Sequence, residues 1–242
     1  MMIWHNQLVP HSFCKLQKLS VDNCGNLKKD FPQNILGIIR NLEELEISNC
    51  ASMEEVFEIR DVNVEETTDT VASILKDLKL FRLPNLKRVW NWDPQAILTF
   101  QTLSKVDIID CIRLESVFPT SVVKSLAQLK ELRIQRCGVE EIVGMEEGSE
   151  TTIEFVLPRL TTLILQDLPE LKCFCPRKLT FKWPSLKSLE IDLCPKVKIV
   201  SSEDLSCQDT NGLGHHHIMI QQPFFLIEKV SARTTSFINI DI

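Results

Sequence analysis

Cysteine and histidine are the residue types in this sequence most able to do chemistry. The chain has 242 residues, of which nine are cysteine and five are histidine. Three histidines are consecutive at 215–217 with Cys207 nearby, but adjacent imidazoles bind divalent ions only weakly and lack the fixed tetrahedral geometry of a structural zinc site. Cys173 and Cys175 form a Cys-x-Cys pair with no second pair at zinc-ribbon spacing. We therefore expect no metal site.

No residue pattern in the sequence is typical of catalysis. The motifs Gly-x-Ser-x-Gly, His-Glu-x-x-His and Gly-x-x-x-x-Gly-Lys-Ser/Thr are absent, and the only histidines outside the cluster are His5 and His11. Carboxylates are abundant, but their positions on strand faces and loops are explained by solvation. We therefore expect a protein that is not an enzyme and that uses no cofactor.

The cysteines belong to a pattern that repeats along the chain. Each copy has three apolar residues, with two residues of any type between the first and second and one between the second and third. The seven copies are Leu16-Leu19-Val21, Leu42-Leu45-Ile47, Leu75-Leu78-Leu80, Leu103-Val106-Ile108, Leu129-Leu132-Ile134, Leu160-Leu163-Leu165 and Leu186-Leu189-Ile191. Five residues after each middle position stand Cys24, Cys50, Leu83, Cys111, Cys137, Leu168 and Cys194. This constant position indicates a structural role for cysteine.

The copies form a larger repeat of three units. Their middle positions are 26, 33, 28, 26, 31 and 26 residues apart, and the order Cys, Cys, Leu recurs. The segment that begins at Phe31 matches the segment that begins 87 residues later at Phe118. Acidic insertions at 58–71 and 144–153 account for the two longest steps, and we expect them to be solvated loops.

Each copy predicts one short strand. Leu45 and Ile47 alternate with Glu46 and Ser48, which is the period of a strand with one buried face. A single unit cannot bury its leucines alone, so neighbouring units must stack with parallel strands. After each strand the chain must turn inward, and there a residue such as Cys50 is readily buried and donates a weak hydrogen bond. The Leu-Pro units are expected to fill the same turn with an apolar side chain.

The units resemble the leucine-rich repeats of plant nucleotide-binding, leucine-rich-repeat disease resistance proteins, most closely those of the coiled-coil class. The repeat pattern L-x-x-L-x-L-x-x-N/C-x-L is carried by "LEELEISNC", "LSKVDIIDC", "LKELRIQRC" and "LKSLEIDLC". Units that end in Cys-x-x-Leu/Met-x-x-Val-Phe alternate with units that read Leu-Pro-x-Leu-Lys. The resemblance implies an α/β leucine-rich repeat solenoid of about 7–8 repeats, curved, with a parallel β-sheet on its concave face and a mixture of short helices and irregular segments on its convex face.

The sequence divides into three parts. Residues 1–200 are predicted to be the leucine-rich repeat array, with short helices in "NILGIIRNL" from Asn34 and "SVVKSLAQL" from Ser121. Residues 201–223 are polar without periodicity and predict an irregular linker or long loop. Residues 224–242 contain a weak copy of the pattern near Ile238 and are predicted to be a degenerate terminal repeat.

Charge and composition restrict the location and the partners. The net charge of −6 argues against nucleic acid or an anionic membrane surface as the partner. The first residues do not read as a signal peptide, and no apolar stretch is long enough to span a membrane. We therefore expect a cytoplasmic protein with reduced thiols.

The residues between the leucines would form the concave surface. Most of them are polar, as a solvated face should be, but Phe81 and Ile109 occupy equivalent positions in neighbouring units and should be adjacent. An apolar pair with arginines nearby has the composition of a binding hot spot, although isolated apolar residues are common on surfaces. The predicted protein-binding residues are Phe81, Arg82, Ile109, Arg133, Arg136, Lys79, Asp107 and Glu46.

The family resemblance implies a role in plant defence. In that family the repeats recognise pathogen signals and restrain a nucleotide-driven switch, but the phosphate loop of the switch is absent from this sequence. What the resemblance implies here is a protein-interaction module whose partner is a pathogen effector, a guarded host protein or the receptor's own switch domain. The alternative is a truncated remnant or decoy with little independent function.

Overall fold

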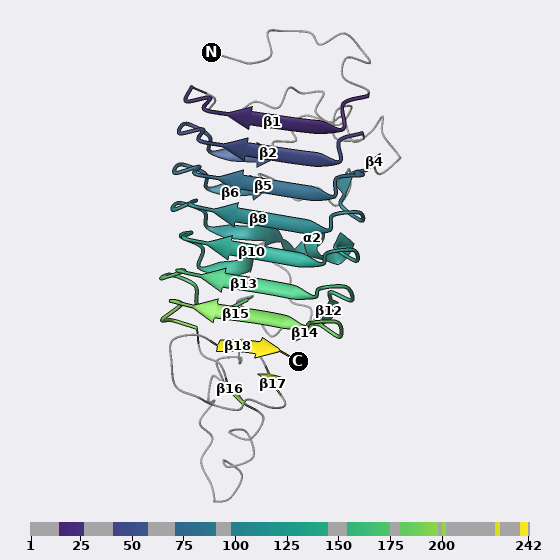
Figure 1. The fold of residues 1–242 in the computed structure, drawn as a ribbon, viewed down its shortest axis with the longest axis vertical. Coiled ribbons are helices and arrows are strands. Elements are labelled where there is room, and N and C mark those ends of the chain that lie inside the picture. Colours follow the sequence, from purple (N-terminus) through teal and green to yellow (C-terminus); the bar gives the residue numbers. More distant parts are fainter. Residues whose placement is uncertain are drawn as a thin grey trace, which may run out of the picture.

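The computed structural model describes residues 15–26, 41–57, 71–90, 98–144, 154–174, 180–197, 200–201, 226–227 and 238–241. Its strands are stacked along one long axis, so the fold is a solenoid (Figure 1). The large sheet forms one face of the stack, and a smaller sheet lies behind it. The parallel-sheet solenoid that the sequence predicts is confirmed.

The large sheet has eight strands in the order β1-β2-β5-β8-β10-β13-β15-β18. The first seven are β1 (Lys18–Asp22), β2 (Glu44–Ser48), β5 (Asp77–Phe81), β8 (Lys105–Ile109), β10 (Glu131–Gln135), β13 (Thr162–Gln166) and β15 (Ser188–Asp192). Each comes from one copy of the sequence pattern, and all pair in parallel and in register. The eighth strand, β18 (Ile238–Asp241), pairs antiparallel with β15, whereas a further repeat would pair in parallel.

Alternation along each strand decides which side chains enter the core. In β2, Leu45 and Ile47 are fully buried, while Glu44, Glu46 and Ser48 remain partly exposed. The strands β5, β10 and β13 show the same alternation. Burial of a leucine contributes about 1.5–3 kcal/mol, so the stacked leucines supply most of the stability of the array.

A residue with positive φ follows each of the seven parallel strands of the large sheet. These residues are Asn23, Asn49, Arg82, Asp110, Arg136, Asp167 and Leu193, with φ between 51° and 61°. The N–H of Asn49 donates to the carbonyl oxygen of Phe81 at 3.0 Å, and the N–H of Arg82 donates to that of Ile109 at 2.9 Å. Equivalent bonds extend the ladder of the sheet at each turn from Asn23 to Asp167. The left-handed residue therefore turns the chain inward without losing a sheet hydrogen bond.

The cysteine that follows this residue fills the turn. The Sγ atoms of Cys50 and Cys137 each lie 3.2 Å from the carbonyl oxygen two residues earlier, to which the thiol donates. All six cysteines in the described part of the chain are free thiols. In the Leu-Pro units, Leu83 and Leu168 are fully buried at the same position. The predicted structural role of these residues agrees with their contacts.

A second parallel sheet lies on the convex side, where the sequence predicts helices and irregular chain. Its strands, in spatial order, are β11 (Glu141–Gly144), β9 (Ser116–Pro119), β6 (Arg88–Trp90) and β3 (Glu55–Phe57). Three aromatic residues of these strands, Phe57, Trp90 and Phe118, pack together with Phe100, and neighbouring ring centroids lie 5.3–5.8 Å apart. The β-branched and aromatic residues that end these units favour strands, which explains the difference from the prediction.

Helix is scarce in the described part of the chain. The helix predicted from Ser121 is present as α2 (Thr120–Ser125), and the one predicted from Asn34 lies almost wholly outside the described residues. None of the described helices is long and apolar enough to cross a membrane. Short strand pairs complete the structure: β4 (Val71–Ala72) with β7 (Leu98–Thr99), β12 (Glu154–Val156) with β14 (Thr180–Lys182), and β16 (Val200–Ser201) with β17 (Leu226–Ile227). The predicted linker after residue 201 and its histidine cluster also lie outside the described residues.

One turn is a residue shorter than its counterparts. Two residues separate Cys111 from the next buried apolar residue, Leu114, whose N–H donates to the carbonyl oxygen of Cys111 at 3.2 Å. Only one residue, Gly138, separates Cys137 from Val139, and the N–H of Gly138 donates to the carbonyl oxygen of Cys111 in the preceding unit. Chain from the preceding unit therefore approaches Gly138 closely.

Candidate functional site

The side chains that face away from the core of the large sheet lie in three rows that run across the strands. The register places Ser20, Glu46, Lys79, Asp107, Arg133, Ile164 and Glu190 in the middle row. The row at the carboxyl ends of the strands contains Asp22, Ser48, Phe81, Ile109, Gln135, Gln166 and Asp192. The row at the amino ends contains Lys18, Glu44, Asp77, Lys105, Glu131, Thr162 and Ser188.

Opposite charges alternate along part of the middle row. Lys79 Nζ lies 4.0 Å from Glu46 Oε2, and Arg133 Nε lies 3.9 Å from Asp107 Oδ1. Lys105 lies 3.7 Å from Asp107 through its Nζ, and it also contacts Glu131. Exposed pairs of this kind each contribute about 0–1 kcal/mol, so they add little to stability. Their main effect is that positive and negative charges are mixed at the centre of the face.

Asp107 is an almost completely buried charge in the middle row of this face. It is only 7% exposed, and Lys105 and Arg133 flank it. Neither its Oδ1 atom nor the Nε atom of Arg133 is within hydrogen-bond distance of a partner. The two groups are therefore held by charge attraction across 3.9 Å, and the rest of the half-exposed Arg133 guanidinium remains accessible.

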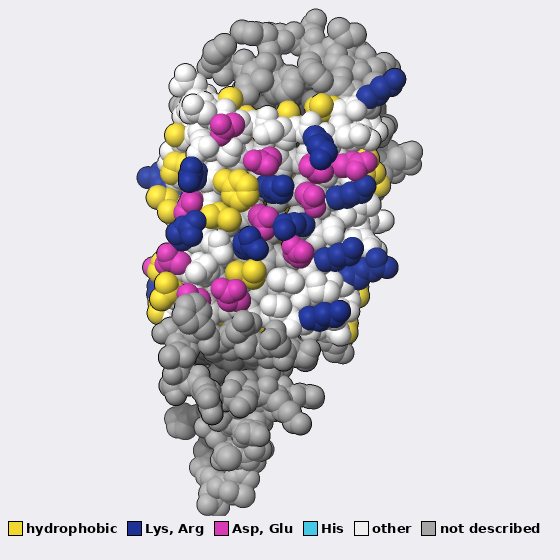
Figure 2. All heavy atoms as spheres, viewed as in Figure 1, with side chains coloured by type: hydrophobic (Ala, Val, Ile, Leu, Met, Phe, Trp, Pro, Cys, Tyr) yellow, Lys and Arg dark blue, Asp and Glu magenta, His cyan; other side chains and the backbone are white. Residues whose placement is uncertain are grey.

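Phe81 and Ile109 lie directly opposite each other on β5 and β8. Both side chains are partly exposed. Their neighbours in the same row are polar: Ser48 on one side, and on the other Gln135, whose Nε2 donates to Gln166 Oε1 at 2.8 Å. Figure 2 shows apolar side chains surrounded by basic and acidic ones near the middle of this face. The predicted apolar pair is therefore present on the surface and is bordered by polar groups.

Two of the predicted arginines lie in the turns beside this pair. Arg136 donates to Asp110 through Nε at 2.5 Å and through Nη2 at 3.2 Å. These bonds, and the nearby positive charge of Arg82, lower the pKa of the Asp110 carboxyl. Arg82 is itself exposed, and none of the described carboxylates lies within ion-pair distance of it. The edge next to Phe81 thus carries an available guanidinium group.

The structure brings most of the predicted site residues together. Phe81, Arg82, Ile109, Arg133, Arg136, Lys79 and Asp107 come from the neighbouring strands β5, β8 and β10 and the turns after them. Glu46 lies one strand further along, on β2.

Sequence reasoning missed several residues that belong to the same surface. Lys105 and Glu131 form an ion pair of 2.7 Å across β8 and β10, and that contact raises the pKa of Lys105. Ile112 is 65% exposed at the edge of the sheet, next to Arg113. Lys105 and Glu131 each directly precede the middle apolar residue of their repeat. That position also faces outward in a strand, so the repeat pattern could have identified this pair. The sequence contains no comparable signal for Ile112.

Comparison with known proteins identifies the origin of the repeats. A family model described as "Plant disease resistance protein RPS2-like, leucine-rich repeats" matches residues 1–138. The "Probable disease resistance protein At4g27220" of Arabidopsis thaliana is 30% identical over 104 residues. That match covers 43% of this chain and 11% of the relative, so the chain spans only a small part of the relative's length. No solved structure matches the chain.

Proposed function

Because the chain belongs to the leucine-rich repeats of plant disease resistance proteins similar to RPS2, we propose that it is a non-catalytic protein-interaction module of a cytoplasmic immune receptor. Its partner would be a pathogen effector, a guarded host protein or the receptor's own switch domain. It would take part in recognition or in restraint of the receptor, and it would need no cofactor, nucleic acid or membrane. The alternative is a remnant or decoy with little independent function.

The apolar pair Phe81–Ile109 is the observation that best supports this proposal. Buried aromatic and aliphatic anchors with arginine nearby contribute most of the binding energy in many protein interfaces. The pair lies on a rigid sheet, so a partner would not have to order the strands when it binds. Neighbouring charges such as Glu46–Lys79 and Asp107–Arg133 would act as a polar rim.

The test compares two double variants that are expressed in leaf cells with an affinity tag. Phe81→Ala with Ile109→Ala removes the apolar pair, and Gln135→Ala with Gln166→Ala is the control from the same row of the sheet. We expect proteins that co-purify with the wild-type chain to be lost from the first variant and retained by the second. Both variants should melt close to the wild-type temperature because the four side chains are partly exposed.

Two results would count against the proposal. Equal recovery of partners by both double variants would exclude the Phe81–Ile109 surface as the binding site. Failure of the wild-type chain to retain any protein above the level of an unrelated tagged control would favour the remnant or decoy.

A further inference from the structure

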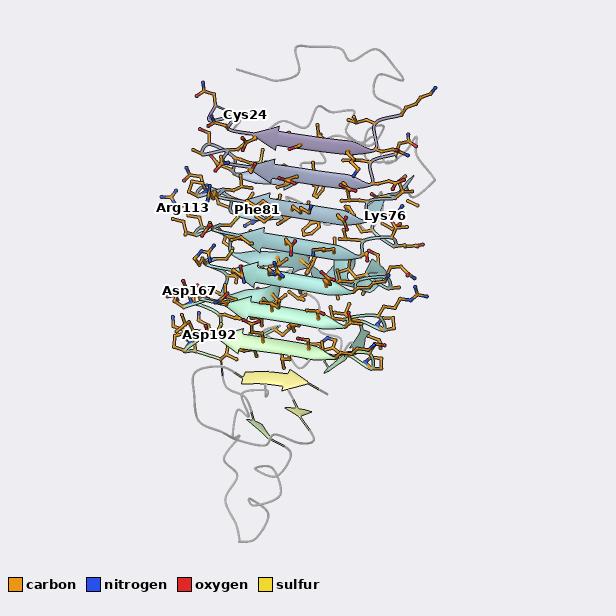
Figure 3. The ribbon with its side chains drawn as sticks, in the orientation of Figure 1. Cys24, Lys76, Phe81, Arg113, Asp167 and Asp192 are labelled. Atoms are coloured by element: carbon orange, nitrogen blue, oxygen red, sulfur yellow. The ribbon has the colours of Figure 1, made fainter. Side chains whose placement is uncertain are left out.

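Two exposed arginines at one edge of the solenoid are left without an acidic partner. Arg82 follows β5, and Arg113 lies in the turn after β8. Figure 3 places Phe81 and Arg113 at the same edge of the large sheet, where the parallel strands end. Within the described ranges, neither Arg82 nor Arg113 forms an ion pair or a side-chain hydrogen bond.

Nearby carboxylates are already used by other cations. Asp110, which begins the turn that contains Arg113, accepts two hydrogen bonds from Arg136. Glu115 lies 3.3 Å from Arg88, through Oε2 and Nε. Glu140 lies 2.5 Å from the Nζ atom of Lys172, and that contact lowers the pKa of Glu140. Among the described residues of this edge, Arg82 and Arg113 are therefore cations whose charge remains available to another molecule.

A hollow lies beside Arg113. It has a volume of about 470 Å³ and is lined by Lys87, Ile112, Arg113, Leu114, Glu115, Gly138, Glu140 and Glu141. It adjoins the shortened turn at Gly138, and Ile112 forms part of its lining. Ile112 is 65% exposed, so its apolar side chain is accessible from the hollow. The hollow thus offers apolar surface at Ile112 with the Arg113 guanidinium beside it, and two of its three glutamates, Glu115 and Glu140, are already paired with Arg88 and Lys172.

The same combination occurs twice along the edge. Arg82 is adjacent to the Phe81–Ile109 pair, and Arg113 is adjacent to Ile112. Arginine binds carboxylates through two parallel N–H groups, which makes it selective for this ligand geometry. A chain that alternates acidic and apolar residues in an extended conformation would present both kinds of group at once.

We propose that the edge formed by Phe81, Arg82, Ile109, Ile112 and Arg113 binds an extended acidic segment of a partner protein. Carboxylates of the segment pair with Arg82 and Arg113, while its apolar side chains contact the Phe81–Ile109 pair and the Ile112 hollow. This proposal rests on the proposed function and adds to it the chemical class of the partner. It also extends the binding surface from the concave face to the lateral edge.

Fluorescence anisotropy with two synthetic peptides tests the proposal. One fluorescein-labelled peptide alternates Asp and Phe, and the other alternates Lys and Phe. We expect the full chain to bind the acidic peptide on the order of ten times more tightly than the basic one, because two carboxylate–guanidinium pairs form only with the first. Arg82→Glu with Arg113→Glu should abolish this preference.

The matched control reverses two exposed lysines at the opposite edge. Lys130 and Lys187 directly precede β10 and β15, and Lys130→Glu with Lys187→Glu makes the same change in net charge. We expect this variant to keep the preference for the acidic peptide. Circular dichroism shows whether the charge reversals disturb folding. If they do, the milder variant Arg82→Gln with Arg113→Gln replaces them, and we expect it to lower the affinity for the acidic peptide.

The outcomes separate this proposal from the proposed function. Equal affinity for both peptides, or equal losses in the arginine and lysine variants, would overturn the acidic class of partner. If Phe81→Ala with Ile109→Ala still lost the cellular partners in that case, the interaction module would remain supported. Loss of acidic-peptide binding in the arginine variants alone would support the edge as the site.

Discussion

The carbonyl oxygen of Ile112 lies 2.1 Å from the position that a Cβ atom on Gly138 would occupy. A contact this short is with backbone, which cannot move aside as a flexible side chain can. The shortened turn after Cys137 is therefore compatible with glycine and with no larger residue.

Gly138→Ala should destabilise the protein by about 1–3 kcal/mol, the usual cost of forcing an added methyl group into a packed site. Urea unfolding followed by circular dichroism measures this change. Gly25→Ala is the control, since a Cβ atom there meets nothing within 4 Å, and we expect it to leave stability nearly unchanged. Similar midpoints for the two variants would contradict the close approach at Gly138.

Leu193→Gly should stabilise the protein. Leu193 has a φ of 52° and is 61% exposed, so it is strained in the left-handed region and gains little from burial. A non-glycine residue in that region costs about 1–2 kcal/mol. Glycine removes this strain, although its greater conformational freedom in the unfolded chain offsets part of the gain. We expect a higher melting temperature in calorimetry.

Ile112→Gly is the contrasting variant for this prediction. Ile112 is similarly exposed but is not among the residues with positive φ. Glycine at that position adds only unfolded-state freedom, so it should lower stability by about 0.5–1 kcal/mol. A melting temperature that falls in both variants would argue that the left-handed turn does not strain Leu193.

The buried turn thiols should resist alkylation in the native protein. Burial raises the pKa of the Cys50 thiol, and contact with the Cys137 thiol, together with burial, raises the pKa of Cys111. Because the thiolate is the reactive form, iodoacetamide at about pH 8 should leave Cys50 and Cys111 unlabelled until urea unfolds the chain. Peptide mapping by mass spectrometry provides the measurement. Rapid native labelling of Cys111 would contradict its position in the core.

Acid should weaken the contacts between neighbouring units. Hydrogen bonds from Ser48 and Asn49 lower the pKa of Asp22, and those from Arg136 lower the pKa of Asp110. A carboxyl group whose folded-state pKa is depressed adds stability above its unfolded pKa of about 3.9, and this stability is lost as the pH falls through the folded-state pKa. We expect the melting temperature to change little between about pH 7 and pH 5 from these groups and to fall below about pH 4.

The variant Asp22→Asn with Asp110→Asn isolates these two carboxylates. It should be less stable than the wild-type protein at pH 7, and its melting temperature should fall less on acidification. An identical acid-induced loss in the variant and the wild type would assign the effect to other groups.

The sequence predicted the large sheet well because its signal is local and repeated. The alternation around Leu45 and Ile47 specifies the buried face, and the recurrence of the pattern specifies the parallel neighbours. The adjacency of Phe81 and Ile109 followed from the same reasoning, and the register confirms it. The position of Cys50 in the inward turn was predictable because it has a constant distance from the strand.

Other features depend on distances that a single sequence does not contain. The convex sheet arises from segments as short as three residues, such as β3 and β6, which carry too few residues to show a period. Among the described residues, Arg82 has no carboxylate partner because the nearby Asp110 is hydrogen-bonded to Arg136, and a single sequence does not show which arginine makes that contact. Asn23 and Asn49 are typical of left-handed turns, but Arg82 and Leu193 at the equivalent position are not, so residue type alone concealed this shared backbone geometry.

The shortened turn at Gly138 also shows how the array tolerates a change in length. Two residues later, the N–H of Glu140 donates to the carbonyl oxygen of Glu115, just as the N–H of Glu115 donates to that of Lys87. The N–H of Lys172 then donates to the carbonyl oxygen of Glu140, so the succession continues into the next unit. A deletion is thus absorbed where it occurs, and the strands on either side keep their alignment. The turns at this edge can therefore differ in length by one residue between units without a change in the register of the sheet.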